Sequence, residues 1–417
     1  MPRTSRVPPA VLAVLALASL SSPVRAQGAP APETVAEGLE FPTGIAFGSG
    51  GRMFVNERAG RVRVVDRGRL EDEPVAEIPT TTTGETGLLG VAVSPDDRFL
   101  YVFVTAPDGA TNGVMRVPVG GGEPEPVLEG LPASVYHNGG GVAFDDDGML
   151  LVSNGEQHDG DRAQDPDALG GKVYRFTPDG GVPDDNPFGG SPALAIGLRN
   201  PYGLTVDPVS GTAFVTENGP SAHDEIDRIV PGGNYGWPIV SGRAADSGLA
   251  EEAQELQGSY RDPLIDLPEI VVPTGIAFAD PATAPGSIAG DLFFATYGEG
   301  TIHRVRLNDE RDEVVSDEIF VDAGEPVIAL AWGPRGLYFS TPDAVKVLPL
   351  AASEASGDES PSPDEGSDRG EPVAPADRTP EDGGSGGNVP VVLVAGAALL
   401  GACVWGALRL RRAFGGG

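Results

Sequence analysis

The chain has 417 residues, of which 60 are glycine and 40 are proline, and its formal charge at pH 7 is −33. So much glycine and proline indicates a fold rich in turns rather than a helical one. The negative charge and the lack of a basic patch interleaved with aromatic residues exclude a nucleic-acid-binding surface. Cys403 is the single cysteine, so neither a disulfide framework nor a thiolate metal site is expected in the soluble part.

Residues 1–26 are expected to be a secretory signal peptide. Arg3 and Arg6 precede an apolar run from Val11 to Leu20. The small residues around Val24-Arg25-Ala26 then offer a cleavage site, so the mature chain is expected to begin at about Gln27.

One pattern recurs from residue 27 to residue 350, and it predicts the fold. Each unit opens with an apolar strand that usually starts at glycine, continues through a polar turn into a second strand, and ends with a third. The openings are Gly44–Phe47, Gly90–Val93, Gly141–Phe144, Gly203–Val206, Gly275–Phe278 and Ala329–Trp332. Turns rich in Gly and Asp between short apolar runs are hairpin signals, and repetition at tens of residues indicates a repeat architecture. Three or four strands per unit, six times over, predict an all-β fold, a six-bladed β-propeller.

The ring is expected to close through an N-terminal strand. The sixth unit has no fourth strand before the chain becomes rich in Pro, Gly and Ser, whereas Glu33–Glu37 precedes the first unit with nothing to pair with. We therefore expect Glu33–Glu37 to complete the last blade, which would remove exposed sheet edges.

The C-terminal part is expected to anchor the protein. Residues 351–388 form an acidic stretch rich in Pro, Gly and Ser that cannot bury a core, and they are predicted to be a disordered stalk. Residues 389–408 are apolar over about the length of a transmembrane helix. The arginines within residues 409–417 predict a short cytoplasmic tail and an extracellular propeller. A processed sorting signal is the alternative for this segment.

The number of residues between successive openings increases from the third unit to the fifth, so long loops are expected there. Functional sites commonly lie in loops held by a rigid scaffold, so we look for the site in this part of the chain. His137 is followed by three glycines, and Glu156 comes at the end of the second strand of the same unit. A carboxylate that fixes the imidazole tautomer would leave the other ring nitrogen free as a base. A surface-loop histidine and a solvated turn acid are the plainer interpretations.

Two further groups fall in the same window. Arg199 and Asn200 precede the opening strand of the fourth unit, and an arginine fork there suits a carboxylate or quinone oxygen, or simply braces loops. The second group combines the tight turn at Gly219-Pro220 with Glu225 and Tyr235. Carboxylates and free carbonyls are the hard oxygen ligands that Ca²⁺ takes, although the spacing is not that of an EF-hand.

Taken together, these residues resemble the glucose/sorbosone dehydrogenase family, the soluble quinoprotein sugar dehydrogenases. The resemblance runs from about Val35 to Val347. Its most specific segments are Glu57–Val64, Gly87–Gly90, Ala163–Pro166, Gly171–Val173, Asp185–Phe188, Gly197–Pro201 and Glu225–Trp237.

The resemblance implies a propeller that uses pyrroloquinoline quinone (PQQ) and Ca²⁺ to oxidise aldose sugars or related polyols and passes electrons to an external acceptor. His137 matches the family's catalytic base, and Glu156 stands where the family has the acid that orients it. Arg199 and Asn200 match residues that contact the quinone, and Arg199 would also stabilise the developing oxyanion. Gly219 and Pro220 match the loop whose carbonyls hold the catalytic Ca²⁺. Glu225 and Tyr235 match a further Ca²⁺ position.

The sequence also departs from the family pattern. Tight quinone binders in the family grip its carboxylates with cations in the fifth and sixth blades, where this chain has Glu299 and Glu325, and Glu85 replaces a frequent glutamine. Two other functions therefore stay open. One is a non-catalytic extracellular propeller that binds a glycan or a protein, and the other is a Ca²⁺-dependent lactone hydrolase on a similar propeller.

Overall fold

The computed structural model describes residues 29–351. The expected signal peptide, stalk, transmembrane helix and cytoplasmic tail lie outside the described residues. Within residues 29–351 no helix is both long and apolar enough to cross a membrane.

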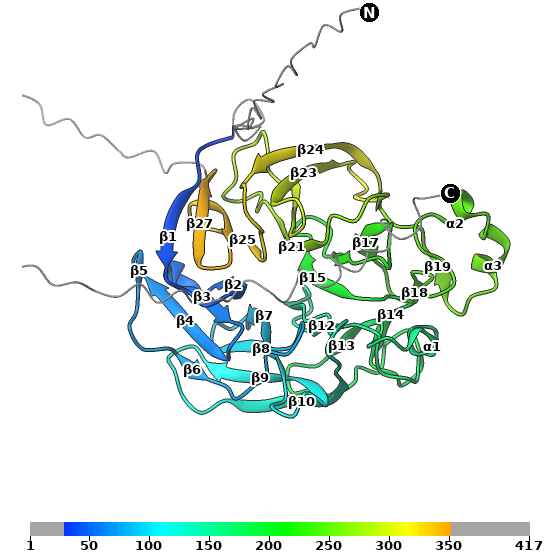
Figure 1. Ribbon diagram of the computed structural model, residues 1–417, viewed down its shortest axis with the longest axis horizontal. Coiled ribbons are helices and arrows are strands. Elements are labelled where there is room, and N and C mark those ends of the chain that lie inside the picture. The colour runs from blue at the N-terminus through cyan, green and yellow to red at the C-terminus, as the bar shows by residue number, and fades with distance from the viewer. Residues whose placement is uncertain (1–28, 352–417) are drawn as a thin grey trace, which may run out of the picture.

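The described strands form six sheets, and the expected all-β propeller is confirmed (Figure 1). The innermost strands are β2 (Pro42–Phe47), β7 (Leu88–Val93), β11 (Val142–Phe144), β15 (Pro201–Val206), β21 (Pro273–Phe278) and β25 (Leu330–Gly333). The second strands are β3 (Met53–Glu57), β8 (Phe99–Thr105), β12 (Leu150–Asn154), β16 (Ala213–Glu217), β22 (Leu292–Thr296) and β26 (Gly336–Ser340). The third strands are β4 (Arg61–Asp66), β9 (Thr111–Pro118), β13 (Lys172–Phe176), β17 (Asp224–Ile229), β23 (Thr301–Leu307) and β27 (Ala344–Pro349).

Outer strands complete the sheets. They are β1 (Glu33–Glu37), β5 (Arg69–Leu70), β6 (Ala76–Glu77), β10 (Glu125–Pro132), β14 (Ala193–Ile196), β18 (Gly233–Asn234), β19 (Ser259–Tyr260), β20 (Ile265–Leu267) and β24 (Val314–Asp322). The sheet that begins with β11 extends outward through β14, β18 and β19, and its last two pairings are parallel. Short helices occupy the insertions: η1 (Ser49–Gly51), α1 (Gly160–Gln164), α2 (Ala244–Ser247) and α3 (Ala250–Gln254).

The innermost strands contact one another in chain order, from β2 through β7, β11, β15, β21 and β25 back to β2. The recurring glycine of the sequence pattern makes this close approach possible. A β-carbon at Gly90 would lie 2.3 Å from the carbonyl oxygen of Gly140, and one at Gly275 would lie 2.3 Å from the backbone nitrogen of Leu330. Both positions face the neighbouring blade, so glycine is needed there because a β-carbon would clash with the backbone of the next inner strand.

The expected ring closure is confirmed. β1 pairs with β27 in antiparallel register, from Glu33 opposite Val347 to Glu37 opposite Ala344. Figure 1 shows the two strands side by side although they come from opposite ends of the described chain. An ion pair between Glu33 and Arg335 joins the same two regions. The N-terminal strand thus covers an edge of the last sheet that would otherwise be exposed.

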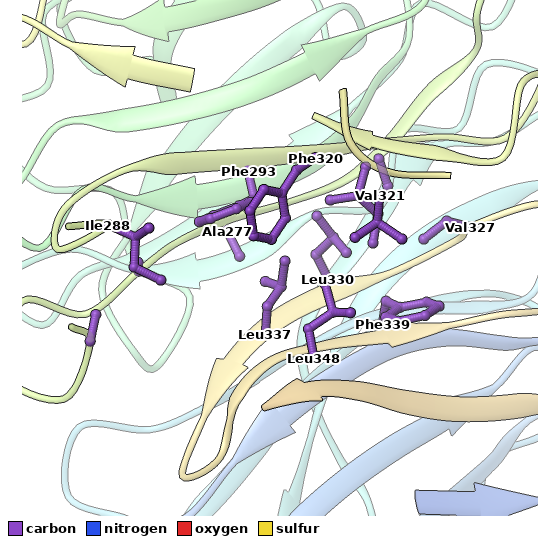
Figure 2. Packing of buried hydrophobic residues seen from close by; sticks show 14 residues of the cluster. Ala277, Ile288, Phe293, Phe320, Val321, Val327, Leu330, Leu337, Phe339 and Leu348 are labelled. Carbon is purple, nitrogen blue, oxygen red and sulfur yellow. The ribbon is translucent and has the colours of Figure 1, made fainter. Parts of the chain in front are cut away.

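The hydrophobic core lies between neighbouring sheets. Figure 2 shows one such layer, in which Phe293 and Phe320 of one blade pack toward Leu337 and Phe339 of the next. The rings of Phe293 and Phe320 meet edge to face, with centroids 5.4 Å apart. Each fully buried side chain of this size contributes about 1.5–3 kcal/mol to stability. The blades are therefore rigid supports for the loops that join them.

A buried lysine holds one of those loops. Lys172 opens β13 and is fully buried, and its Nζ donates to the carbonyl oxygens of Gly170, at 2.8 Å, and Arg162, at 2.5 Å. Burial lowers the pKa of Lys172 to about 8. Because both acceptors belong to the loop that connects β12 and β13, this lysine fixes the segment that follows Glu156.

The same burial predicts a pH dependence of stability. Lysine in the unfolded chain titrates near pH 10.4, so between pH 8 and that value the unfolded state binds more protons than the folded state. The free energy of unfolding should therefore rise with pH in this window, by up to about 1.4 kcal/mol per pH unit, and Lys172→Met should lack this slope. Urea unfolding of both proteins between pH 7.5 and about 9.5 measures the difference. Lys346→Met, which removes the other lysine, is the control, and parallel profiles for wild type and Lys172→Met would contradict the assignment.

Candidate functional site

The structure brings His137 and Glu156 together, as the sequence predicted. Nδ1 of His137 lies 2.5 Å from Oε1 of Glu156, and both side chains are buried. Glu156 follows β12 directly, whereas His137 lies in the loop between β10 and β11, so the hairpin of one blade supplies both groups. The hydrogen bond at Nδ1 leaves Nε2 of the imidazole as the atom that can exchange a proton with a ligand.

The loop carrying His137 is held by contacts from its own blade and from neighbouring ones. The backbone N–H of His137 donates to Oε2 of Glu85 at 2.8 Å, and Nδ2 of Asn200 donates to the same oxygen at 3.3 Å. Nε2 of Gln157 donates to the carbonyl oxygen of His137 at 3.0 Å. His137 has a left-handed φ of 61°. These contacts explain how a non-glycine residue is kept in that conformation. They also explain why an acid is accommodated at Glu85, since both of its partners donate.

Burial lowers the pKa of His137 below its ordinary value. The hydrogen bond that the imidazole donates to Glu156 opposes this shift, whereas the positive charge of Arg199 acts in the same direction as burial. The net effect favours the neutral imidazole, which is able to accept a proton.

Arg199 and Asn200 are set in place by a carboxylate to which sequence reasoning gave no such role. Glu217, at the end of β16, accepts the backbone N–H of Asn200 at 2.6 Å and that of Arg199 at 3.1 Å. Oδ1 of Asn200 accepts the N–H of Gly139 at 3.0 Å, which ties this turn to the loop of His137. The fourth blade thus contacts the histidine loop through Asn200 directly.

The turn at Gly219 is also organised around Arg199. The guanidinium NH1 donates to the carbonyl oxygens of Asn218, at 2.7 Å, and Gly219, at 3.0 Å. The N–H of Gly219 donates to Oδ1 of Asp224 at 2.8 Å. Asp224 is buried and its other oxygen accepts two N–H groups of the adjacent blade, from Val271 and Val272. The loop is therefore rigid, and Pro220 lies at its exposed outer side.

Glu225 and Tyr235 line one small cavity together with Arg199, Gly219 and Glu217. Pro220 does not line it. The hydroxyl of Tyr235 donates to the carbonyl oxygen of Arg228 and accepts the N–H of Val230, so it is already satisfied by backbone. Of the four predicted metal ligands, the structure therefore gathers Gly219, Glu225 and Tyr235 around one space.

Three buried carboxyl groups gather beside this cavity. Glu217 lies opposite Glu225 across the β16–β17 pair, and Asp227 follows Glu225 on the same face of β17. None of the three forms an ion pair within the described part of the chain. Burial raises the pKa of Glu217 to about 8 and that of Glu225 to about 7, and it raises the pKa of Asp227 as well. Such a group has the charge and ligand chemistry that a hard cation complements.

A second, mostly apolar cavity adjoins the histidine loop. It is lined by aromatic side chains and a few polar groups: Phe41, Thr43, Arg58, Glu85, Leu89, Asn200, Tyr202, Asn218, Val272, Thr274, Tyr297 and Ile328. Arg58 is the one cation among the described residues that line it. Its side chain is fixed by donation to the carbonyl oxygens of Thr86, at 3.0 Å, and Thr82, at 2.6 Å.

Comparison with known proteins agrees with this geometry. The family model described as "Glucose / Sorbosone dehydrogenase" matches residues 39–347. The chain belongs to the glucose/sorbosone dehydrogenase family. Membership makes it an oxidoreductase.

The chain is also similar to individual named proteins. Aldose sugar dehydrogenase YliI of Escherichia coli K12 is 28% identical over 345 residues, covering 76% of this chain and 92% of the relative. Quinoprotein glucose dehydrogenase B of Acinetobacter calcoaceticus is 29% identical over 260 residues, covering 52% and 54%. The PQQ-bound form of aldose sugar dehydrogenase from Streptomyces coelicolor superposes with a TM-score of 0.65 at 31% identity, covering 75% of this chain and 95% of that one.

The residues of this dehydrogenase fit a planar anionic cofactor. The second cavity offers aromatic faces and the guanidinium of Arg58, and Nε of Arg199 is buried without a hydrogen-bond partner among the described residues. Glu325, where the family pattern has a cation, forms an ion pair with Lys346, so its charge is neutralised within the fold. The repulsion expected from the sequence at that position is therefore reduced.

Sequence reasoning gave no site role to Arg58 or His158, and it placed Glu217 and Asp224 in the carboxylate-rich loop around Gly219 without assigning them individual roles. Arg58 and Glu217 stand at strand ends within the repeating units and could have been found by their position. His158 packs against His137 with ring centroids 4.0 Å apart. The printed sequence gives no signal for that contact, because it depends on the conformation of the loop after Glu156.

Proposed function

We propose that this chain is a cell-surface, calcium-dependent quinoprotein that oxidises aldose sugars or related polyols. The buried pair of His137 and Glu156 beside the aromatic cavity supports the proposal most strongly. A general base held in its reactive tautomer next to a cavity for a planar cofactor is the arrangement that removal of a hydroxyl proton requires.

When bound, pyrroloquinoline quinone supplies an electrophilic carbonyl carbon that accepts hydride from the sugar carbon. Nε2 of His137 removes the proton of the sugar hydroxyl, and Glu156 keeps the imidazole in the correct tautomer and stabilises its protonated form. Arg199 and Asn200 would hold the oxygens of the bound cofactor, and the guanidinium of Arg199 would stabilise negative charge on them. Arg58 would face a cofactor carboxylate from the first blade, in place of the family's cations in the fifth and sixth.

We place Ca²⁺ at the cavity beside Gly219, where the Gly219 carbonyl and the buried carboxyl groups of Glu217 and Glu225 supply hard oxygen ligands. Arg199 now donates to that carbonyl, so binding of the cation requires the guanidinium to turn away from it. Pro220 does not line the cavity, so it can act as a Ca²⁺ ligand only through its backbone carbonyl. Tyr235 likewise has only its carbonyl to offer.

Two observations weigh against the other candidate functions. The central channel is lined by glycine, aliphatic residues, Thr43 and Tyr202, with no carboxylate among the described residues that form it. A lactone hydrolase whose central metal is held by several carboxylates would need them there. The non-catalytic propeller was favoured because the family's cations in the fifth and sixth blades are missing here. Arg58 supplies a cation in the aromatic cavity and Lys346 neutralises Glu325, so this argument against a dehydrogenase is weaker.

Reconstitution tests the proposal. The full-length protein is incubated with Ca²⁺ and pyrroloquinoline quinone, quinone binding is followed by quenching of protein fluorescence, and a sugar panel is then tested with an artificial dye acceptor. We expect quinone-dependent dye reduction that is lost on chelation of Ca²⁺. Binding without reduction of dye by any sugar would favour the binding propeller, and absence of both would reject the proposal.

The cell-surface location is proposed from the sequence of the two ends of the chain. Deletion of residues 389–417 should release the propeller into the medium, because no other segment after the signal peptide is long and apolar enough to span a bilayer. Fractionation and immunoblotting of cells that express the full-length and the truncated proteins measure the release. Retention of the truncated protein in the membrane fraction would contradict the anchoring role of this segment.

A further inference from the structure

A third side chain joins the buried pair of His137 and Glu156. His158 is exposed, and one ligand-type atom from each of these three residues lies within 4.8 Å of the others. This is the one group of three such residues that meets this criterion in residues 29–351. Its members come from the loops that precede β11 and follow β12, so the rigid hairpin of one blade fixes their separation.

Glu156 carries a further sign of a ligand position. The side chain is 98% buried, since only 2% of its surface is exposed, and its Oε2 has no hydrogen-bond partner among the described residues. Leaving a buried carboxylate oxygen unsatisfied costs free energy, and native structures seldom do so without a reason. This oxygen belongs to the same carboxylate that contacts His137. A cation bound between the three residues would satisfy it.

We propose that His137, Glu156 and His158 form a binding site for a divalent transition-metal ion of the zinc type. Two imidazoles and one carboxylate are the ligand set that Zn²⁺ takes when it keeps an open fourth position. The same set is poorly suited to Ca²⁺, which takes oxygen ligands almost exclusively. The site is thus separate in chemistry and place from the calcium position beside Gly219.

The geometry requires a local rearrangement of the three side chains. Ligands about 2.1 Å from zinc in tetrahedral arrangement lie about 3.4 Å from one another. The present separation of up to 4.8 Å closes to this value if the exposed side chain of His158 moves toward the buried pair. The buried pair must open as well, because Nδ1 of His137 and Oε1 of Glu156 lie only 2.5 Å apart, and the hydrogen bond between them is lost when the metal binds.

Zinc bound here would block proton removal, a consequence that rests on the proposed function. The ion would occupy the imidazole that accepts the sugar proton, so transition-metal ions would inhibit the dehydrogenase reversibly. Binding itself does not depend on that reaction. A measured metal site without sugar oxidation would therefore support the site while rejecting the proposed function.

The site is tested by titrating Zn²⁺ into the full-length protein and measuring binding by isothermal titration calorimetry. Excess Ca²⁺ is present so that sites with oxygen ligands are already filled. We expect one zinc ion per chain and a loss of affinity on the order of 10- to 100-fold or more in His158→Ala. His303→Ala is the matched control, because His303 forms a comparable contact with Asp317, at 3.0 Å, outside the cluster. It should bind zinc as tightly as wild type.

Inhibition gives a second readout. If the protein oxidises sugars, the zinc concentration that halves the rate, relative to each protein's zinc-free rate, should rise by a similar factor in His158→Ala. Absence of zinc binding by wild type would overturn the proposal. Equal zinc affinity of wild type and His158→Ala would overturn it as well, and so would a loss of affinity confined to His303→Ala.

Discussion

Replacing His137 with alanine is expected to lower the turnover of sugar oxidation by about 10²- to 10⁴-fold, the usual contribution of a positioned general base. The structure gives the reason, because the imidazole is buried, is oriented by Glu156 and is kept neutral by its surroundings. Steady-state rates of dye reduction with Ca²⁺ and saturating quinone measure the effect. Quinone affinity, followed by fluorescence, should change much less than the rate.

His303→Ala again serves as the control, since it removes a histidine paired with an acid on the outer part of a blade. Its turnover should match that of wild type. Thermal unfolding of both variants must first show that the fold is kept. If His137→Ala retains full turnover while folded, the base lies elsewhere and the proposed role of the buried pair is wrong.

The second large effect concerns the fold. Gly203→Ala is expected to destabilise the protein by about 1–3 kcal/mol or more, the cost of adding volume to a tightly packed site. The new β-carbon would lie 2.2 Å from the carbonyl oxygen of Thr274 and 2.9 Å from Oγ1 of Thr216. Neither atom can move freely, because the Thr216 hydroxyl accepts the N–H of Gly203 and donates to that same carbonyl oxygen. Urea unfolding measures the loss.

Gly286→Ala is the matched control, because no atom lies within 4 Å of the β-carbon position there and its φ is not positive. Its stability should stay within about 0.5 kcal/mol of wild type. Equal stability of Gly203→Ala and Gly286→Ala would mean that the inner strands can separate without cost. The close approach would then not be the reason for the recurring glycine.

The repeated sequence pattern was sufficient to predict the strands, because hydrophobic alternation and turn residues are local signals. The first three strands of each unit lie where the openings and the apolar runs after them indicated. The prediction that Glu33–Glu37 closes the ring is confirmed. It could be made because the N-terminal strand had no partner in the first unit and the last unit lacked its fourth strand. The glycine that starts all openings but the last, which has Ala329, was visible as a repeat, but its cause, the contact with the next blade, was not.

The site was predicted in part. His137 and Glu156 are 19 residues apart within one hairpin, so a local argument could bring them together. The contacts that hold them come from much farther along the chain: Glu85 reaches the backbone of His137 across 52 residues, and Asn200 reaches Glu85 across 115. No periodicity within a unit carries that information.

The repeat, the strands, the family resemblance and the candidate residues could be predicted from residue type and spacing along the chain. Which charges meet depends on the folded arrangement of the blades. This arrangement paired Glu325 with Lys346, placed Arg58 in the aromatic cavity and buried Glu217, Glu225 and Asp227 together. The physical reason is that burial and the distance between charges set electrostatic energies, and both follow from how the blades close into a ring.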